Sequence, residues 1–347
     1  MKTARNFERL EKIVQSFPNV TVTVLGDMVA DEFVFGEISR VSREAPVLIL
    51  KHRDRTVVPG GGGNAACNLA DLGVNVLLVG VVGMDEPGKL LLQCFRHKHI
   101  PITGIRKLKG FNTVTKTRIL AGMTHTSRQQ VVRVDREPES AFDSWTEREL
   151  VLAAKEYARA SDALLVSDYG YGAATPEILQ SIGRANGIPI TVDSRYRMLE
   201  YVGITAATPN EPEVEEALHV RIGHDEEKLH WAANELMKRM KLQSLVITRG
   251  RDGMLALERK HKPVGIPIFG DDQVVDVTGA GDTVIATFTA GLAAGATTEE
   301  AALLANYTGG IVVMKRGTAT VTQHELLAAL KKDAQNVAEN DLDREDD

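Results

Sequence analysis

Residues 276–283 read Asp-Val-Thr-Gly-Ala-Gly-Asp-Thr and lead into a long run rich in alanine. The apolar spacing of that run predicts a helix over 281–294, with the glycines at its N-terminus. Backbone N–H groups at such an end lack intrahelical acceptors and feel the helix dipole, so they predict an anion hole. Asp282 stands beside this hole, where a carboxylate can accept a proton from a hydroxyl group. The alternative is that Asp282 is only a helix N-cap and the glycines only form a turn.

A base beside an anion hole is the pairing that phosphoryl transfer to an alcohol requires. The segment is not a Walker loop, because no Gly-Lys-Ser/Thr follows the glycines. It is not a dinucleotide fingerprint either, because it lies far from the first strand and lacks the third glycine.

Outward from this segment, the second half of the chain alternates strand-like and helix-like runs. Short apolar runs at 163–167, 189–192 and 245–248 predict strands, and amphipathic patterns between and after them predict helices. In the first half, similar apolar runs at 20–25 and 75–82 predict two more strands. This alternation predicts an α/β fold with a mostly parallel sheet covered by helices on both faces.

Two early groups of β-forming residues break this alternation, because no helical pattern separates their members. We therefore expect a small separate sheet of short antiparallel strands, from about 31–58 and 111–136. The expected organisation is one domain over 1–332 followed by an acidic, frayed tail over 333–347.

Four glycines at 60–63, followed by Asn64, precede a run of small residues with helical spacing. A glycine run suits a place where a ligand approaches the main chain, and a polyhydroxyl ligand would suit Asn64. Asp27 and Asp31 flank the end of the first strand, where α/β proteins bind ligands, and their carboxylates could accept hydrogen bonds from sugar hydroxyls. The alternatives are a flexible loop capped by Asn64, and two acids of a solvent-exposed turn.

Composition excludes several classes of protein. The 347 residues carry a net charge of −6 without a basic block, which argues against a nucleic-acid partner bound by bulk charge. Two cysteines cannot form a disulfide scaffold. No apolar run approaches the ~20 residues of a membrane span, and the N-terminus lacks the apolar core of a signal peptide. We therefore expect a cytoplasmic protein without a membrane partner.

The two glycine motifs, taken together, resemble the two signatures of the PfkB family of carbohydrate kinases, also called the ribokinase family. The first is Gly60–Asn64 with Ala65 and Ala66 and with glycines at 73 and 83, and the second is 276–282. The resemblance covers roughly 20–330. It implies a ribokinase-like three-layer α/β/α sandwich with a β-sheet lid, a sugar or sugar-phosphate substrate, and ATP with Mg²⁺ and K⁺. It also implies a homodimer formed through the lid.

Roles follow at the positions of the family's motifs. Asp282 is implied to be the catalytic base, with Gly279, Ala280 and Gly281 as the anion hole. The residues implied to bind ATP and, for Glu213 through water, Mg²⁺ are Asn210, Glu213, Thr248, Arg249, Gly250, Gly253 and Asn306. Those implied to hold K⁺, in part through the backbone, are Asp276, Thr278 and Gly317. The substrate site is expected to comprise Asp27, Asp31, Gly61, Gly62, Asn64, Lys116, Arg118, Asp168 and Arg195.

Within the family, segments 24–31, 39–47, 113–118 and 276–285 resemble the branch that phosphorylates D-glycero-β-D-manno-heptose 7-phosphate on its anomeric hydroxyl, toward ADP-heptose and lipopolysaccharide. Lys116 and Arg118, two residues apart on a strand, would share the face that binds the substrate phosphate; the alternative is an ordinary solvated face. Because the chain ends soon after Leu330, we expect the stand-alone kinase without a nucleotidyltransferase domain.

Two positions depart from this branch. Tyr171 stands where the branch has lysine, and Ser194-Arg195 stands where it has Pro-Lys. Arg195 can still bind a phosphate in bidentate fashion. A kinase for another sugar, such as fructose, ribose or a ketodeoxy acid, is therefore the first alternative. A non-catalytic sugar- or nucleotide-binding protein on the same fold is a remote one.

Overall fold

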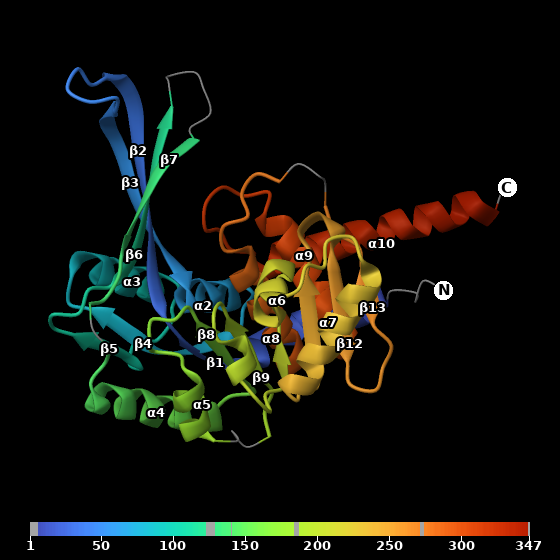
Figure 1. Cartoon of the computed structure of the whole chain (residues 1–347). Helices are drawn as coiled ribbons and strands as arrows, with labels where there is room; N and C mark the ends of the chain where they lie inside the picture. The colour runs from blue at the N-terminus through green and yellow to red at the C-terminus, as the bar shows by residue number, and fades with distance from the viewer. Residues whose placement is uncertain (1–5, 123–128, 140, 184–186, 271–273, 346–347) are drawn as a thin grey trace.

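The computed structural model describes residues 6–122, 129–139, 141–183, 187–270 and 274–345. A nine-stranded sheet forms the body, in the order β13-β12-β11-β10-β9-β8-β1-β4-β5 (Figure 1). The strands from β11 through β5 in this order run parallel, and β12 and β13 add an antiparallel edge. The strands are β1 (Thr21–Gly26), β4 (Asn75–Gly83), β5 (Ile105–Leu108), β8 (Ala163–Asp168), β9 (Ile190–Ser194), β10 (Ala206–Ala207), β11 (Ser244–Thr248), β12 (Met254–Glu258) and β13 (Val264–Ile266).

Helices cover both faces of this sheet, because its central strands carry apolar residues on both sides. Along β1, Val22 and Val24 join one hydrophobic cluster, whereas Leu25 joins the cluster on the opposite face. The first layer contains α1 (Phe7–Ser16), α2 (Gly62–Asp71), α3 (Glu86–His97), α8 (Ala280–Ala293), α9 (Thr298–Val312) and α10 (Gln323–Glu345). The second contains α4 (Ser144–Arg159), α5 (Pro176–Ile182), α6 (Glu211–Leu218) and α7 (Glu226–Arg239). The predicted three-layer α/β fold is confirmed.

The predicted lid is a four-stranded sheet in the order β3-β2-β6-β7, and it projects from the body (Figure 1). Its strands are β2 (Met28–Val41), β3 (Leu48–Gly61), β6 (Val114–Gly122) and β7 (Gln129–Arg136). The sequence predicts short antiparallel pieces, whereas β2 and β3 each have 14 residues and β2 pairs with β6 in parallel. The parallel pair arises because the chain returns to the body after β3 and leaves it again in the same direction.

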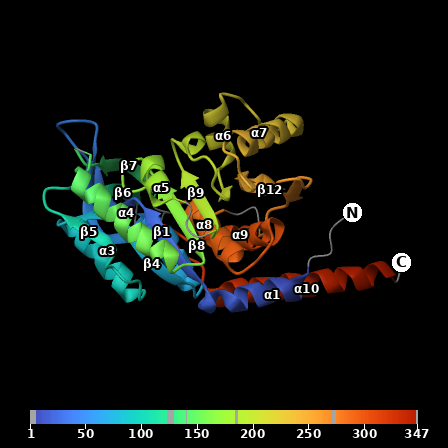
Figure 2. The ribbon, with the colours of Figure 1, turned by 90° about the horizontal axis from the view of Figure 1, so that it is seen from below.

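The expected frayed tail is corrected by α10, which runs to Glu345; residues 346 and 347 lie outside the described part of the chain. Leu326 and Leu330 are fully buried, and α10 lies alongside α1 (Figure 2). Once these leucines anchor the helix, each further residue adds a hydrogen bond, so it continues through an acidic segment without apolar periodicity. Among the described residues, no helix is both long and apolar enough to cross a membrane.

Candidate active site

Asp282 lies in the first turn of α8, at the end of the body sheet from which the lid projects. The N-cap is Gly279, with φ of +79°, and no side chain of the described residues caps this helix, so the N-cap alternative for Asp282 is wrong. A Cβ at Gly279 would stand 2.6 Å from Asn64 Nδ2, which explains the glycine. The Asp282 carboxylate is 3% exposed and accepts hydrogen bonds from Asn64 Nδ2 (2.9 Å) and the Tyr169 hydroxyl (2.9 Å).

The environment of Asp282 suits a proton acceptor. Burial raises the pKa of its carboxyl to about 7, and the hydrogen bonds from Asn64 and Tyr169 partly oppose this rise because they stabilise the anion. A carboxyl with a pKa near neutrality can take a proton from an alcohol and release it again at physiological pH. The geometry therefore supports the role that the sequence predicts for this residue.

The predicted anion-hole segment lines a cavity of about 790 Å³ together with Asp282. A Cβ on Gly281 would meet open space, so the backbone here is accessible from the cavity. The N–H of Ala280 donates to the carbonyl oxygen of Val277 (3.2 Å), and it is therefore already engaged. The neighbouring backbone at Gly281 is the part of this segment with the most room for an anion.

Asn210 and Glu213 are joined by a reciprocal capping box that begins α6. The Asn210 side chain accepts from the Glu213 N–H (2.8 Å), and Glu213 Oε2 accepts from the Asn210 N–H (2.9 Å). Both residues line the same cavity as Asp282. Burial raises the pKa of Glu213, so the carboxylate gains from a nearby cation. A structural role as a cap and a role in binding are therefore compatible at these residues.

The turn after β11 closes another side of this cavity. Thr248, Gly250 and Gly253 line it, and a Cβ at Gly253 would stand 2.1 Å from the Ile266 carbonyl oxygen. Asn306 lines the cavity from α9 and donates from Nδ2 to the Pro267 carbonyl oxygen (2.9 Å).

Arg249, also predicted to bind ATP, lines the same cavity. Its guanidinium makes ion pairs with Glu211 and Glu226, both at 2.9 Å. Its charge therefore also ties α6 to the start of α7.

Asp276 forms hydrogen bonds with the other two residues predicted to hold a monovalent cation. Its carboxylate accepts from the Thr278 N–H (2.9 Å) and from the Gly317 N–H (3.0 Å). Burial by itself would raise the pKa of Asp276, but these hydrogen bonds outweigh it and hold the pKa below its usual value. An anionic carboxylate thus fixes the turn before α8 to the turn after α9.

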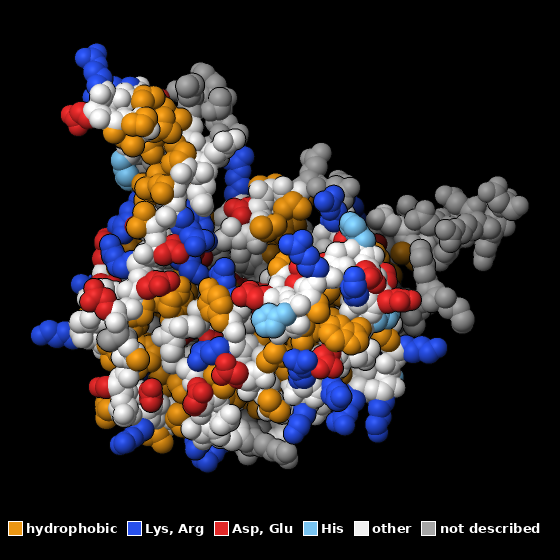
Figure 3. All heavy atoms as spheres, in the orientation of Figure 1, with side chains coloured by type: hydrophobic (Ala, Val, Ile, Leu, Met, Phe, Trp, Pro, Cys, Tyr) orange, Lys and Arg blue, Asp and Glu red, His pale blue; other side chains and the backbone are white. Residues whose placement is uncertain are grey.

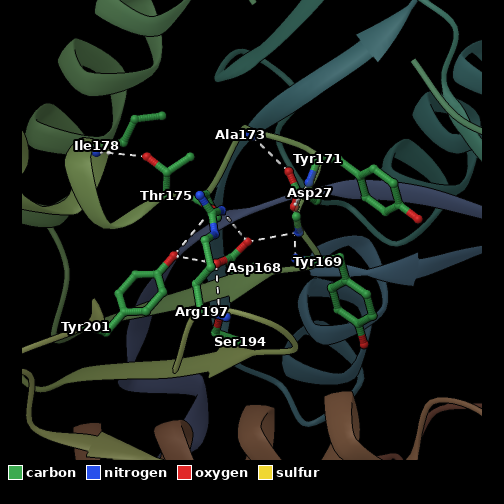
Figure 4. Close-up of polar contacts among 12 residues, drawn as sticks. Asp27, Asp168, Tyr169, Tyr171, Ala173, Thr175, Ile178, Ser194, Arg197 and Tyr201 are labelled. Carbon is green, nitrogen blue, oxygen red and sulfur yellow. Dashed lines mark hydrogen bonds and ion pairs between the residues drawn. The ribbon is translucent and has the colours of Figure 1, made fainter. Parts of the chain in front are cut away.

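Asp27, predicted as a sugar ligand or an exposed turn acid, is neither (Figure 4). It is 2% exposed, and its carboxylate accepts from the N–H groups of Tyr169 (2.9 Å), Tyr171 (3.0 Å) and Ala173 (2.8 Å). Burial raises its pKa to about 6 against the effect of these three hydrogen bonds. Asp27 therefore shapes the loop that follows β8.

Asp168, also predicted to bind substrate, is filled by protein donors as well (Figure 4). It accepts from the Gly170 N–H (2.9 Å), and its side-chain donors are Ser194 (3.0 Å), Arg197 (2.8 Å) and Tyr201 (2.8 Å). The four donors to this buried carboxylate are all protein groups, so these contacts do not indicate that Asp168 binds a sugar. Asp168 instead joins β8 to the segment after β9.

The glycine run contacts the protein itself. A Cβ at Gly62 would stand 2.8 Å from the Gly26 Cα, and Gly61 has φ of +54° with the Asp27 carbonyl oxygen close by. The chain that closely approaches the glycine run is thus the protein's own strand β1. Asn64 likewise donates to Asp282, and its side-chain oxygen accepts from Asn68 (3.1 Å), which corrects the capped-loop alternative.

The lid brings predicted cations to the same region. Lys116 is buried, with Nζ 5.1 Å from the ring centre of Tyr169, and burial lowers its pKa although the charge of Asp31 opposes this. Arg118 makes an ion pair with Asp31 and stacks on Phe33 (5.4 Å). The Arg118 guanidinium and the Asp31 carboxylate therefore already bind each other.

Sequence analysis missed three residues that line the site: Tyr169, Asp193 and Glu216. They share a second cavity, of about 510 Å³, with Arg195 and Glu213. Burial, reinforced by the charges of Glu213 and Asp282, raises the pKa of Asp193 well above its usual value. Asp193 lies near the carboxyl end of β9, and this position in a parallel sheet is the signal that could have revealed it.

A buried carboxylate that faces a roomy cavity at the carboxyl edge of a doubly covered parallel sheet, beneath a second sheet, suits a kinase for a small molecule. Residues 22–325 match the pfkB family of carbohydrate kinases, and the chain belongs to that family.

Its relatives include proteins from several bacteria. The chain is 40% identical over 316 residues to the bifunctional protein HldE of Nitrosococcus oceani, covering 90% of this chain and 64% of that protein. It is 38% identical over 315 residues to the HldE protein of Geobacter sulfurreducens, covering 90% of this chain and 63% of that protein. The chain thus spans less than two thirds of the length of these relatives.

Solved structures show the same fold. The Arabidopsis thaliana ribokinase complexed with ribose and ATP superposes with a TM-score of 0.71 at 19% identity, covering 90% of this chain and 99% of that one. Phosphofructokinase-2 from Escherichia coli, in complex with substrates and products, gives a TM-score of 0.71 at 19% identity, covering 90% and 98%.

Proposed function

We propose that this chain transfers the γ-phosphoryl group of ATP to the anomeric hydroxyl of a phosphorylated heptose, D-glycero-β-D-manno-heptose 7-phosphate. The class of reaction rests on the family, and the substrate rests on the resemblance to the heptose branch and on the 37–40% identity to the HldE proteins. The observation that carries the proposal is the meeting of a buried base, Asp282, with lid cations at one site.

The transfer step follows from the contacts of Asp282. Its carboxylate accepts the proton of the acceptor hydroxyl, and the oxygen of that hydroxyl attacks the γ-phosphorus in line with the bond to be broken. That bond, between the γ-phosphorus and the oxygen of ADP, breaks, and ADP leaves with the electron pair. The accessible backbone at Gly281 and the dipole of α8 stabilise the negative charge that develops on the transferred group.

Phosphate recognition is assigned to the cations on the other side of Tyr169. The positive charge of Arg195 contributes to lowering the pKa of Lys116, so the two groups are near enough to repel each other. Such a pair is stabilised by an anion, and Arg195 is exposed beside the second cavity. The lysine that the heptose branch carries at 171 is absent, but Lys116 Nζ lies 5.9 Å from the Tyr171 ring centre and supplies a cation there.

Two metal ions suit residues of the site. Glu213, a half-buried carboxylate beside Asp193 on the cavity wall, fits Mg²⁺ held in part through water, and Mg²⁺ would neutralise the phosphates of ATP. Asp276, Thr278 and Gly317 join two turns around an anionic carboxylate, and their oxygens fit a monovalent cation such as K⁺. We assign these ions as expected cofactors.

The lid is the proposed dimer interface. Every residue of β7 is exposed, and exposed apolar side chains gather on the lid (Figure 3), among them Val132 and Val134 on β7. We expect the double variant Val132→Asp with Val134→Asp to sediment as a monomer where the unmodified protein sediments as a dimer. A monomer in both cases would remove the lid dimer from the proposal. We expect the protein to act in the cytoplasm.

The test of the proposed function is ADP release with Mg-ATP and K⁺, measured with heptose 7-phosphate and with unphosphorylated heptose, fructose and ribose. We expect kcat/KM for heptose 7-phosphate to exceed that of each free sugar by more than 100-fold. If a free sugar is the better substrate, the protein is a pfkB kinase for another sugar and the assignment of the lid cations fails.

A further inference from the structure

Tyr169 connects the two halves of the site although no motif pointed to it. It directly follows β8, and its hydroxyl donates to Asp282 Oδ1 (2.9 Å). The ring of Tyr169 also contacts Lys116, whose Nζ lies 5.1 Å from the ring centre. Tyr169 also lines both cavities. A single side chain thus touches the base and supports the cation of the lid.

The backbone of Tyr169 is held from below by a buried carboxylate (Figure 4). Asp27 accepts its N–H (2.9 Å) and the N–H groups of Tyr171 and Ala173 in the same loop. Three charge-assisted hydrogen bonds to one desolvated carboxylate leave the loop little freedom. The position of the tyrosine ring is therefore set by β1 and β8, which are rigid parts of the body sheet.

We infer that Tyr169 is a positioning residue for phosphoryl transfer, which holds the Asp282 carboxylate in its reactive orientation and supports Lys116 at the substrate phosphate. The inference rests on the proposed function. Its first part follows from the sharing of Asp282 between two donors: Tyr169 binds Oδ1, and Asn64 binds Oδ2 at 2.9 Å. With both oxygens fixed, the carboxylate keeps a remaining lone pair of each oxygen for the substrate hydroxyl.

The same hydrogen bond sets how readily Asp282 gives up its proton. Donation from the tyrosine stabilises the carboxylate anion. The other groups that face Asp282 are Asn64, the carboxylates of Asp31 and Asp193, and the Lys116 ammonium. Tyr169 itself stays protonated, because burial raises its pKa well above the usual value. Loss of its hydroxyl therefore makes Asp282 a weaker acid.

The test compares Tyr169→Phe with Tyr157→Phe. Tyr157 is the matched control because it loses a hydroxyl that bonds Thr103 (2.7 Å), away from the site. We expect Tyr169→Phe to lower kcat at pH 7 by about 10- to 100-fold and to move the acid limb of the kcat profile upward by about one pH unit, the size of one hydrogen bond to a charged group. The KM for ATP should stay within about threefold, and Tyr157→Phe should match the unmodified protein.

A kcat profile for Tyr169→Phe that coincides with that of the unmodified protein would overturn the inference. A fall in kcat without movement of the acid limb would overturn the part that concerns Asp282. The carboxyl pKa of Asp282, measured by ¹³C NMR on both proteins without substrate, separates this result from failure of the proposed function. We expect that pKa to rise in Tyr169→Phe whichever sugar is the substrate, and an unchanged value would contradict the contact.

Discussion

Strands β8 and β7 show how differently the two sheets are built. Every residue of β8 is buried, and it lies in the middle of the body, whereas every residue of β7 is exposed at an edge of the lid. The polar groups at the end of β8, such as Asp168, have several protein partners. On the lid, the Lys116 ammonium lies near the rings of Tyr169 and Tyr171, and charges of both signs act on it.

This difference suggests a division of work. A body whose polar groups are already bonded to one another keeps its geometry when substrates bind, which suits the transfer step. The exposed part of the lid, which includes β7 and the middle of β3, can adjust to a ligand at little cost. We therefore expect changes in the body to act on kcat and on stability, and changes in the lid to act on substrate recognition.

The largest effect is expected at Asp282, the proposed catalytic base, which lies in the body. Asp282→Asn removes the proton acceptor, so kcat should fall by about 10³-fold or more while ATP binding, measured by calorimetry, persists. Asp143→Asn is the matched control, because asparagine caps α4 as well as aspartate does. If Asp282→Asn retains a tenth of the activity, another group is the base.

Stability should also depend on pH through Asp282. Its carboxyl has a pKa of about 7 in the folded protein against a usual 3.8, so the folded state holds the extra proton between these values. Stability from this group is therefore full below about pH 4 and is lost as pH rises to about 7, by at most about 4 kcal/mol. Unfolding by urea should show a shallower loss over this range in Asp282→Asn. Identical pH dependence in both proteins would contradict the burial of this charge.

Removal of a lid cation should change recognition. Lys116→Met should lower kcat/KM for heptose 7-phosphate by about 10- to 100-fold, because one charge-assisted contact with the phosphate is lost. Activity on free sugars, however low, should change far less, and so should the KM for ATP. Equal losses on phosphorylated and free sugars would place Lys116 outside the phosphate site. Lys155→Met on α4 serves as the control.

The smallest effect on catalysis is expected at Arg249, where the sequence suggested a nucleotide ligand. Arg249→Met leaves Glu211 and Glu226 without their cation and should lower the free energy of unfolding by about 1–2 kcal/mol. The KM for ATP should rise less than about threefold. A rise of 30-fold would return Arg249 to the nucleotide site.

The sequence predicted elements with strong patterns and residues in motifs. The buried runs of β1 and β4, the glycines before α8 and the lid were all recognisable, because each has a local physical cause. Short strands such as β13, with 3 residues, carry too little pattern. The end of α10 was missed because helix propagation needs no apolar residues once its first turns are packed.

The roles of acidic residues could not be read from the sequence for a different reason. Asp27 and Asp282 each directly follow a glycine in a motif, and both are buried. Within the described part of the chain, the first accepts from backbone donors and the second from side-chain donors, and those partners come from residues more than a hundred positions away. Such distant partners decide which carboxylate shapes a loop and which can act as a base.

The central claim is that the body transfers a phosphoryl group to the anomeric oxygen of a sugar that already carries a phosphate. Its most direct test is ³¹P NMR of the reaction of heptose 7-phosphate with Mg-ATP. We predict one new resonance from a phosphate on the anomeric carbon, with a coupling to its proton, growing as ATP is consumed. ATP consumption that stays at the level without sugar, or a new phosphate on another carbon, would contradict the account.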